Sequence, residues 1–488
     1  MSRSILVGLL AFAVVLSGTA YAEVQNIKVS GDLDIKGVVH SNYDLKDKQK
    51  NERQLNAGGT GDVVTNDDDE RFVLSTMHIN VDADLTDNVS TSVRLLNQRK
   101  WDNFTAGVDQ ITIDNAYVTL REFLYSPLTI IAGRQNLRYG SQFIVGDGLL
   151  ADPEGVFPST ATTGTQLNGR EYSAFNAFDA IRAILDFSPV TVEGVWAKVN
   201  ETGVVDNDHD LYGVVVNYKM DRWNAEVEPY WFHKRDHSGA APVTVNDSTA
   251  AGAARTYETN EVHTGGLRLA ASPIEGLKLS GEGAHQWGQL IDTTNYQERS
   301  RDAWAANVYA NYTWAAAPWT PSTGAGWVFY SGEEPNGVPE AADGFDRNDE
   351  FNAWDPMYRG SFTTFIQDFL GGADSPGNLY ATFDGNDTDA ATNRHLFYAD
   401  LKVNPLKDIT LWGRYTHVRF DEAPRPGRDT HAGDEVDVKA LYDYTEDVQL
   451  GLFGGWFIPG EYYDEPVNSF NRGNDLAWTA GASGSVKF

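Results

Sequence analysis

The sequence predicts an all-β fold, a transmembrane antiparallel up-and-down β-barrel of about 18 strands, with 16 strands as the alternative. Three observations predict it. Polar and apolar residues alternate along segments longer than ordinary soluble strands, short turns alternate with long polar connections, and the chain ends resemble an export signal and a membrane strand. A mean hydropathy of −0.40 without a long apolar run argues against a helical membrane protein.

The first 22 residues have the pattern of a Sec signal peptide. Arg3 precedes an apolar run from Ile5 to Leu16, and Ala20-Tyr21-Ala22 forms a small-residue cleavage site. We expect cleavage after Ala22, leaving residues 23–488 as a single barrel domain. Export then places the mature protein in the outer membrane of a Gram-negative cell.

The last residues, 475–488, show the alternation most clearly. A strand of this length, apolar on one side and polar or small on the other, suits a membrane barrel. A terminal phenylalanine is the usual address read by the outer-membrane insertion machinery, and we expect Phe488 to be recognised by it. The apolar or small residues of one face are Leu476, Trp478, Ala480, Ala482, Gly484, Val486 and Phe488.

The same period of two recurs along the chain. Charged residues on the second face would be costly in lipid, so this face is expected to line a wet lumen. The weakest predicted strands are 127–135 and 324–331. The full set is 26–40, 71–85, 89–100, 111–123, 127–135, 176–187, 190–200, 209–219, 222–234, 259–271, 276–288, 301–315, 324–331, 392–403, 408–420, 434–445, 447–459 and 475–488.

Eight tight turns alternate with nine longer connections, which predicts 18 strands with both termini on the periplasmic side. The largest connections lie near 41–70, 136–175, 235–258 and 332–390. A barrel this wide encloses a water-filled channel unless something plugs it. The glycine-rich connection 136–175 is therefore expected to fold inward and narrow the channel, with an ordinary surface loop as the alternative.

Composition disfavours several other classes. A net charge of −31 argues against nucleic-acid partners. The absence of cysteine excludes disulfides, thiolate catalysis and covalently attached c-type haem. No zincin or serine-hydrolase motif occurs, and a barrel lipase using His395 or His417 on the outer wall is disfavoured. We expect no enzymatic activity, no cofactor and no bound metal.

Several motifs resemble the alginate-export family of outer-membrane porins. They occur in order over most of the mature chain: residues 132–140 (AGRQNLRYG), 178–182 (FDAIR), 210–213 (DLYG), 433–437 (GDEVD), 454–457 (GGWF) and 460–462 (GEY). The resemblance implies an eighteen-stranded barrel. It also implies transport, because the best-known member passes a polyanionic polysaccharide through an arginine-lined pore, whereas others are simply porins.

Candidate selectivity residues are arginines that match the family motifs, Arg134, Arg138 and Arg182, together with Arg170 in the same long connection. A ring of guanidinium groups at a constriction attracts carboxylates or phosphates. The alternative is that these groups pair with acids of the wall and only neutralise it. Further charged residues on polar strand faces are Arg94, Arg268, Arg394, Arg414, Glu226, Glu228, Glu282, Asp437 and Lys439.

The connection 332–390 carries 13 acidic residues and two arginines, and Asp67 to Glu70 add a second acidic run. No spaced EF-hand-like loop occurs, so solvated or lipopolysaccharide-bridging acids are favoured over a Ca²⁺ site. An acidic mouth concentrates cations and repels a polyanion. These acidic connections depart from the arginine-lined pore of the family's best-known member, which argues against an acidic polysaccharide as the substrate.

These observations favour an outer-membrane porin for passive passage of small hydrophilic solutes or ions. Three alternatives remain: a polysaccharide exporter, a sheath housing a periplasmic or multihaem partner, and a receptor or adhesin that displays acidic loops. The expected partners are outer-membrane lipid, lipopolysaccharide, the solutes and the insertion machinery. A monomer is favoured because the exporter of the family is monomeric.

Overall fold

A computed structural model gives the structure of the protein. It describes residues 26–43, 45, 70–101, 111–146, 177–200, 209–236, 260–292, 297–333, 350–369, 392–423, 427, 429–464 and 475–488. The predicted signal peptide, 1–22, and Arg170 lie outside the described residues.

Eighteen strands form one sheet, so the predicted fold class is confirmed and the 16-strand alternative is wrong. Both of the weakest predicted strands are present. The strands are β1 Asn26–Ser41, β2 Glu70–Thr86, β3 Val89–Lys100, β4 Thr112–Leu120, β5 Leu128–Gln135, β6 Phe178–Asp186, β7 Val190–Asn200, β8 His209–Met220, β9 Ala225–Asp236, β10 Asn260–Ala271, β11 Leu277–Asp292, β12 Gln297–Thr313, β13 Ser322–Tyr330, β14 Arg394–Leu406, β15 Ile409–Arg419, β16 His431–Asp443, β17 Val448–Pro459 and β18 Ala477–Lys487.

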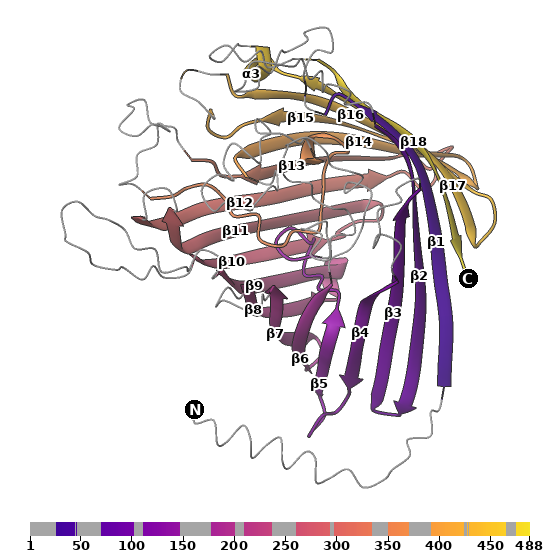
Figure 1. Cartoon of the computed structure of the whole chain (residues 1–488), viewed down its shortest axis with the longest axis vertical. Helices are drawn as coiled ribbons and strands as arrows, with labels where there is room; N and C mark the ends of the chain where they lie inside the picture. Colours follow the sequence, from indigo (N-terminus) through magenta and orange to yellow (C-terminus); the bar gives the residue numbers. More distant parts are fainter. Residues whose placement is uncertain are drawn as a thin grey trace, which may run out of the picture.

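Each strand pairs antiparallel with its neighbours in sequence, and β1 also pairs with β18, which closes the barrel. Figure 1 shows the indigo β1 lying beside the yellow β18. At this seam, the backbone N–H of Gly31 donates to the carbonyl of Phe488 at 2.8 Å, and the N–H of Phe488 donates back at 2.9 Å. Closure leaves no unpaired sheet edge, which a membrane-spanning sheet requires.

Strand ends differ from the predicted ones where the backbone turns. β4 ends at Leu120 rather than at residue 123, because Glu122 and Leu124 adopt positive φ angles of 52° and 66°. An extended strand excludes such angles. β9 begins at Ala225 because the preceding residues form the short 3₁₀ helix η2, Arg222–Asn224.

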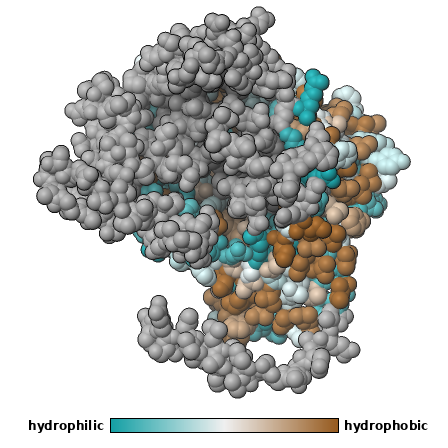
Figure 2. Space-filling model, viewed as in Figure 1, coloured by the Kyte–Doolittle hydropathy of each residue, from teal (hydrophilic) through white to brown (hydrophobic). Residues whose placement is uncertain are grey.

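The two faces of the wall are chemically distinct, as the alternation predicts. On β10, Leu267 and Leu269 are exposed on the outside, whereas Arg268 between them contacts acids inside the barrel. Figure 2 shows apolar side chains gathered over the outer wall at lower right, where Figure 1 places β1 to β4. An apolar exterior with polar groups inside is the pattern of a barrel surrounded by lipid.

The main buried cluster lies inside the barrel rather than between two layers. It joins inward-facing residues of the wall, such as Phe178 and Phe232, to residues of two connections, such as Phe143 and Trp354. Among the residues that the structure describes, no helix has the length and apolar character of a membrane span.

Candidate functional site

The lumen contains two connections, which we call the first inward segment, residues 136–146, and the second inward segment, residues 350–369. In the first, Leu137, Phe143, Ile144 and Val145 are almost fully buried. Phe143 stacks on Tyr330 of β13, with the ring centroids 5.3 Å apart. The described part of the 136–175 connection therefore folds inward, as predicted, and residues 147–175 lie outside the described part.

Hydrogen bonds to carboxylates of the wall anchor the first inward segment. The Tyr139 hydroxyl donates to Glu193, which also accepts two bonds from Arg182, at 2.6 and 2.9 Å. Burial and the neighbouring Glu193 raise the pKa of Tyr139, so this phenol remains a donor. Ser141 Oγ donates to Glu282 at 2.6 Å on the β11 wall.

The two inward segments pair with each other across the lumen. The N–H of Gly146 donates to the carbonyl of Tyr358 at 2.7 Å, and the N–H of Tyr358 donates to the carbonyl of Ile144 at 3.1 Å. Gly360 donates to the carbonyl of Gln142 at 2.8 Å. The segments therefore form one hydrogen-bonded unit, so releasing either removes partners from the other.

One end of the second inward segment is held by β9 and β11. The Lys234 ammonium lies 3.1 Å from both oxygens of the buried Asp355. The Gln286 side chain bonds both backbone groups of Asp355, donating at 2.9 Å and accepting at 2.8 Å. Buried charges need an ion-pair partner and buried backbone groups need hydrogen bonds, and Lys234 and Gln286 supply these to Asp355.

The other end of the segment is held by buried charges. Asp368 contacts Arg359 at 3.2 Å and Arg394 of β14 at 3.4 Å. The Glu435 carboxylate on β16 accepts three backbone N–H bonds from residues 365–367, at 2.7, 2.8 and 2.8 Å. These residues enter the short 3₁₀ helix η3, Gln367–Phe369, so Glu435 satisfies its otherwise unpaired donors.

Acid is expected to loosen the second inward segment. Burial alone would raise the pKa of Asp368, but the guanidinium groups of Arg359 and Arg394 outweigh it and hold the pKa below the ordinary 3.8. A carboxylate whose pKa is lower in the docked state stabilises that state fully when the pH is above its pKa in the undocked state. This stabilisation is lost as the pH falls through its pKa in the docked state. Single-channel conductance is therefore expected to rise as the pH falls below about 3.8, and conductance that does not change until the barrel itself unfolds in acid would contradict this.

Most of the predicted lumenal arginines lie on the inner face and contact carboxylates or carbonyls. Arg268 donates to Glu226 at 2.9 Å, beside Glu228, which accepts from Asn217 at 3.1 Å. Arg414 donates to Asp400 at 3.2 Å and to the carbonyl of Thr363 at 2.9 Å. Arg94 contacts Asp114 and donates to Asn136 at 2.8 Å. The geometry of these groups matches the pairing alternative more closely than a ring of uncompensated charge.

Two further predicted residues, Asp437 and Lys439, lie on the inner face of β16 against the second inward segment. Asp437 is fully buried, and both its carboxylate and the Cβ of Phe365 lie beside Gly455. A Cβ added at Gly455 would be 2.7 Å from Asp437 Oδ1 and 3.3 Å from Phe365 Cβ. The Lys439 ammonium lies 4.6 Å from the ring centroid of Phe365. Both groups therefore lie against the docked segment rather than facing an open, water-filled lumen.

The prediction that Arg134 lines the lumen is wrong. Its strand neighbour Gln135 is buried inside, and alternate residues of a strand face opposite sides, so Arg134 faces outward. It is paired in register with the exposed Asp179, at 3.7 Å between the charged groups. The family motif identifies the residue but not the phase of its strand. Arg138, by contrast, is exposed within the first inward segment.

The acidic connection 332–390 is also different from the expectation. Glu333 is held by Arg299, Asp355 by Lys234 and Asp368 by Arg359 and Arg394, and all three acids are buried. The prediction of solvated acid is therefore wrong for these three. Sequence reasoning missed the inward segment, although an aromatic-rich stretch was a signal: Phe351, Trp354, Tyr358, Phe362, Phe365 and Phe369.

This geometry defines a class of protein: a closed β-barrel with an apolar exterior, whose lumen is narrowed by its own connections. Residues 24–472 match the model of the family described as alginate export, and the chain belongs to that family. No curated protein sequence matches the chain.

Solved porin structures share the fold at low sequence identity. Pseudomonas aeruginosa OpdO has 10% identity and a TM-score of 0.50, covering 95% of this chain and 98% of its own. A BenF-like porin from Pseudomonas fluorescens Pf-5 has 9% identity and a TM-score of 0.52, with 95% and 99% covered. Pseudomonas aeruginosa OccK2 (OpdF), solved with glucuronate, has 9% identity and a TM-score of 0.51, with 95% and 99% covered. These likenesses show that the fold is that of outer-membrane porins.

Proposed function

We propose that the protein is a passive outer-membrane channel for small hydrophilic solutes or ions, narrowed by the two inward segments. The observation that carries this proposal is that these segments are hydrogen-bonded to each other and anchored to several strands of the 18-stranded wall, the first to β7 and β11 and the second to β9, β11, β14 and β16. A barrel of this size otherwise leaves an aqueous channel wide enough for larger cargo. Narrowing by fixed side chains selects solutes by size and charge.

The same observation argues against two alternatives. A sheath must leave its lumen free for a partner protein, whereas here the chain itself occupies part of that space. A polymer exporter with an arginine ring needs uncompensated cations, whereas Arg182, Arg268 and Arg414 each contact a carboxylate. The overall charge of −31 further disfavours entry of a polyanion.

The test is the reversal potential of the purified barrel in a planar bilayer under a KCl gradient. We expect a small conductance with a modest preference for cations. Strong anion preference would revive the exporter, and no conductance would remove the channel proposal and favour a receptor. Sizing with neutral sugars of increasing mass would then give the width of the constriction.

Charge reversal at Arg138 is expected to increase cation preference. The side chain is exposed in the first inward segment, whereas the outward-facing Arg134 provides a matched control four residues earlier. A unit charge about 7 Å from a passing ion in water interacts with it by about 0.6 kcal/mol, which changes the local ion concentration about threefold. Arg138→Glu should therefore shift the reversal potential and Arg134→Glu should not; equal shifts, or none, would place the filter elsewhere.

Residues 1–22 are proposed to be a cleaved Sec signal, and Phe488 is proposed to be the contact for the insertion machinery. Deleting Phe488 is expected to lower the amount of folded barrel in the outer membrane several-fold. Refolding in detergent should be affected much less, because the other β1–β18 pairs remain. Equal losses in cells and in detergent would instead assign Phe488 a role in closing the seam.

We also propose that the protein is a monomer, which light scattering in detergent tests.

A further inference from the structure

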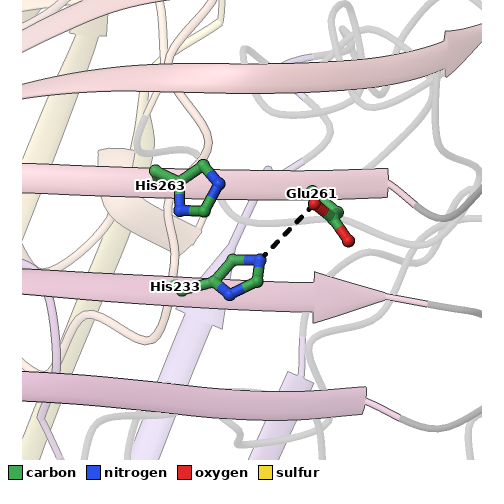
Figure 3. A group of neighbouring side chains, drawn as sticks. All are labelled: His233, Glu261 and His263. Carbon is green, nitrogen blue, oxygen red and sulfur yellow. Dashed lines mark ion pairs between the residues drawn. The ribbon is translucent and has the colours of Figure 1, made fainter.

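A cluster of three potential metal ligands lies on the outer wall, separate from the lumen. His233 of β9 and His263 of β10 are direct partners in the strand register, and Glu261 precedes His263 by two residues on the same face. Figure 3 shows the three side chains lying together, with Glu261 toward the ends of the two strands that carry them. One nitrogen or oxygen from each residue falls within 4.8 Å of the others.

The strand alternation places this cluster outside the barrel. His263 and Glu261 share the face of Leu267 and Leu269, which are exposed, and the lumenal Arg268 has the opposite phase. Aromatic rings flank the histidines: Trp231 and Trp287 stack on His263, with ring centroids 5.8 and 5.6 Å away. The cluster therefore lies among the aromatic side chains typical of the membrane–water interface.

The hydrogen bonding of the two histidines is incomplete. His233 Nε2 and His263 Nδ1 are buried and have no hydrogen-bond partner among the described residues. His233 Nε2 lies 3.8 Å from Glu261 Oε2, which is too far for a hydrogen bond. A buried ring nitrogen without a partner is costly in either tautomer, and a metal ion bound to the lone pair of the deprotonated nitrogen would remove that cost.

We propose that His233, Glu261 and His263 bind a divalent transition-metal ion, with Zn²⁺ and Cu²⁺ as the best fits. Two imidazoles and a carboxylate form a well-known donor set for Zn²⁺, and imidazole also suits Cu²⁺. Metal–nitrogen distances of about 2.0 Å require the donor atoms to approach to roughly 3.3 Å, so the rings must rotate on binding. Bound metal would link β9 to β10 near their outer ends.

Neighbouring charges set the properties of this site. Arg235 lies 3.8 Å from Glu261 Oε1, so it competes for one oxygen and leaves Oε2 to the metal. A second group on the outer wall, His417, His431 and Asp434, is already bonded internally. There Asp434 accepts from Tyr415 at 2.6 Å and bonds His417 at 2.8 Å. We therefore assign the metal to the first group.

The test uses untagged full-length barrel in detergent and CuCl₂ or ZnCl₂ as the probe. Cu²⁺ should quench part of the tryptophan fluorescence with saturation, because Trp231 and Trp287 contact His263. Calorimetry should give one Zn²⁺ per chain. His233→Gln and His263→Gln should each remove the saturable quenching and the calorimetric site, and Glu261→Gln should weaken both.

His395→Gln is the matched control, because His395 also stacks on a tryptophan, Trp327, but bonds Asp421 at 3.0 Å. It should leave metal binding unchanged. Zn²⁺ should also raise the temperature at which the wild-type barrel loses its folded mobility on gels, and should not do so for His263→Gln. Undiminished binding in both histidine variants, equal loss in His395→Gln, or no saturable binding by wild type would each overturn the proposal.

Discussion

Replacing Glu435 by alanine is expected to release the second inward segment and raise single-channel conductance several-fold. The carboxylate accepts the backbone N–H groups of Phe365, Ile366 and Gln367, and its side chain is fully buried. Each buried donor left without an acceptor costs about 1–3 kcal/mol, so the substitution removes about 3–9 kcal/mol of docking free energy. Hydrogen exchange of a peptide covering residues 363–369 should accelerate in parallel.

Glu435→Gln is the matched variant. Its amide oxygen still accepts, but its NH₂ group faces a third donor, so conductance should lie between those of wild type and Glu435→Ala. The opposite ordering, or unchanged hydrogen exchange in Glu435→Ala, would show that the segment is held by its other anchors. The most direct of these are Asp355 and Asp368, which retain their cationic partners in either variant.

Replacing Gly140 by valine is expected to displace the first inward segment and give the second-largest rise in conductance. Gly140 has a φ of +55°, which a β-branched residue rarely adopts. A Cβ there would lie 2.9 Å from Glu228 Oε1 and 3.1 Å from Arg268 Cδ. The left-handed backbone costs about 1–2 kcal/mol, and the contact adds to it by disturbing a buried charged cluster.

The control for this substitution is Gly281→Val on the outer face of β11. Gly281 is paired in register with the exposed Leu269, and an added Cβ would meet nothing within 4 Å. Conductance should remain that of wild type. If Gly140→Val also conducts like wild type and melts at the same temperature, the first segment does not narrow the channel.

The fold could be predicted from the sequence because its two determinants are local. Alternation with a period of two gives each strand and its faces, and the turn residues give the breaks between strands. All 18 strands follow from these, with errors at ends such as Leu120, where residues other than glycine adopt positive φ. Local signals also placed Arg94, Arg268 and Arg414 on inner faces.

The contents of the lumen depend on pairings between residues far apart in sequence. Asp368 meets Arg394 across 26 residues, and Glu435 meets the backbone of Ile366 across 69. No periodicity reports such pairs, so the sequence alone predicts solvated acids in the 332–390 connection. Arg134 differs for another reason: a short motif identifies the residue, whereas the phase of β5 decides which face of the wall it lies on.

The seam between β1 and β18 has a consequence for how the chain reaches its native state. Trp478 to Lys487 pair with Asp32 to Ser41, so the final contacts join segments separated by almost the whole chain. Non-local pairings of this kind make folding slow, because the entropy of closing the chain is lost before the contacts form. A chain that lacks β18 leaves β1 and β17 as unpaired sheet edges, and exposed edges of this kind favour aggregation.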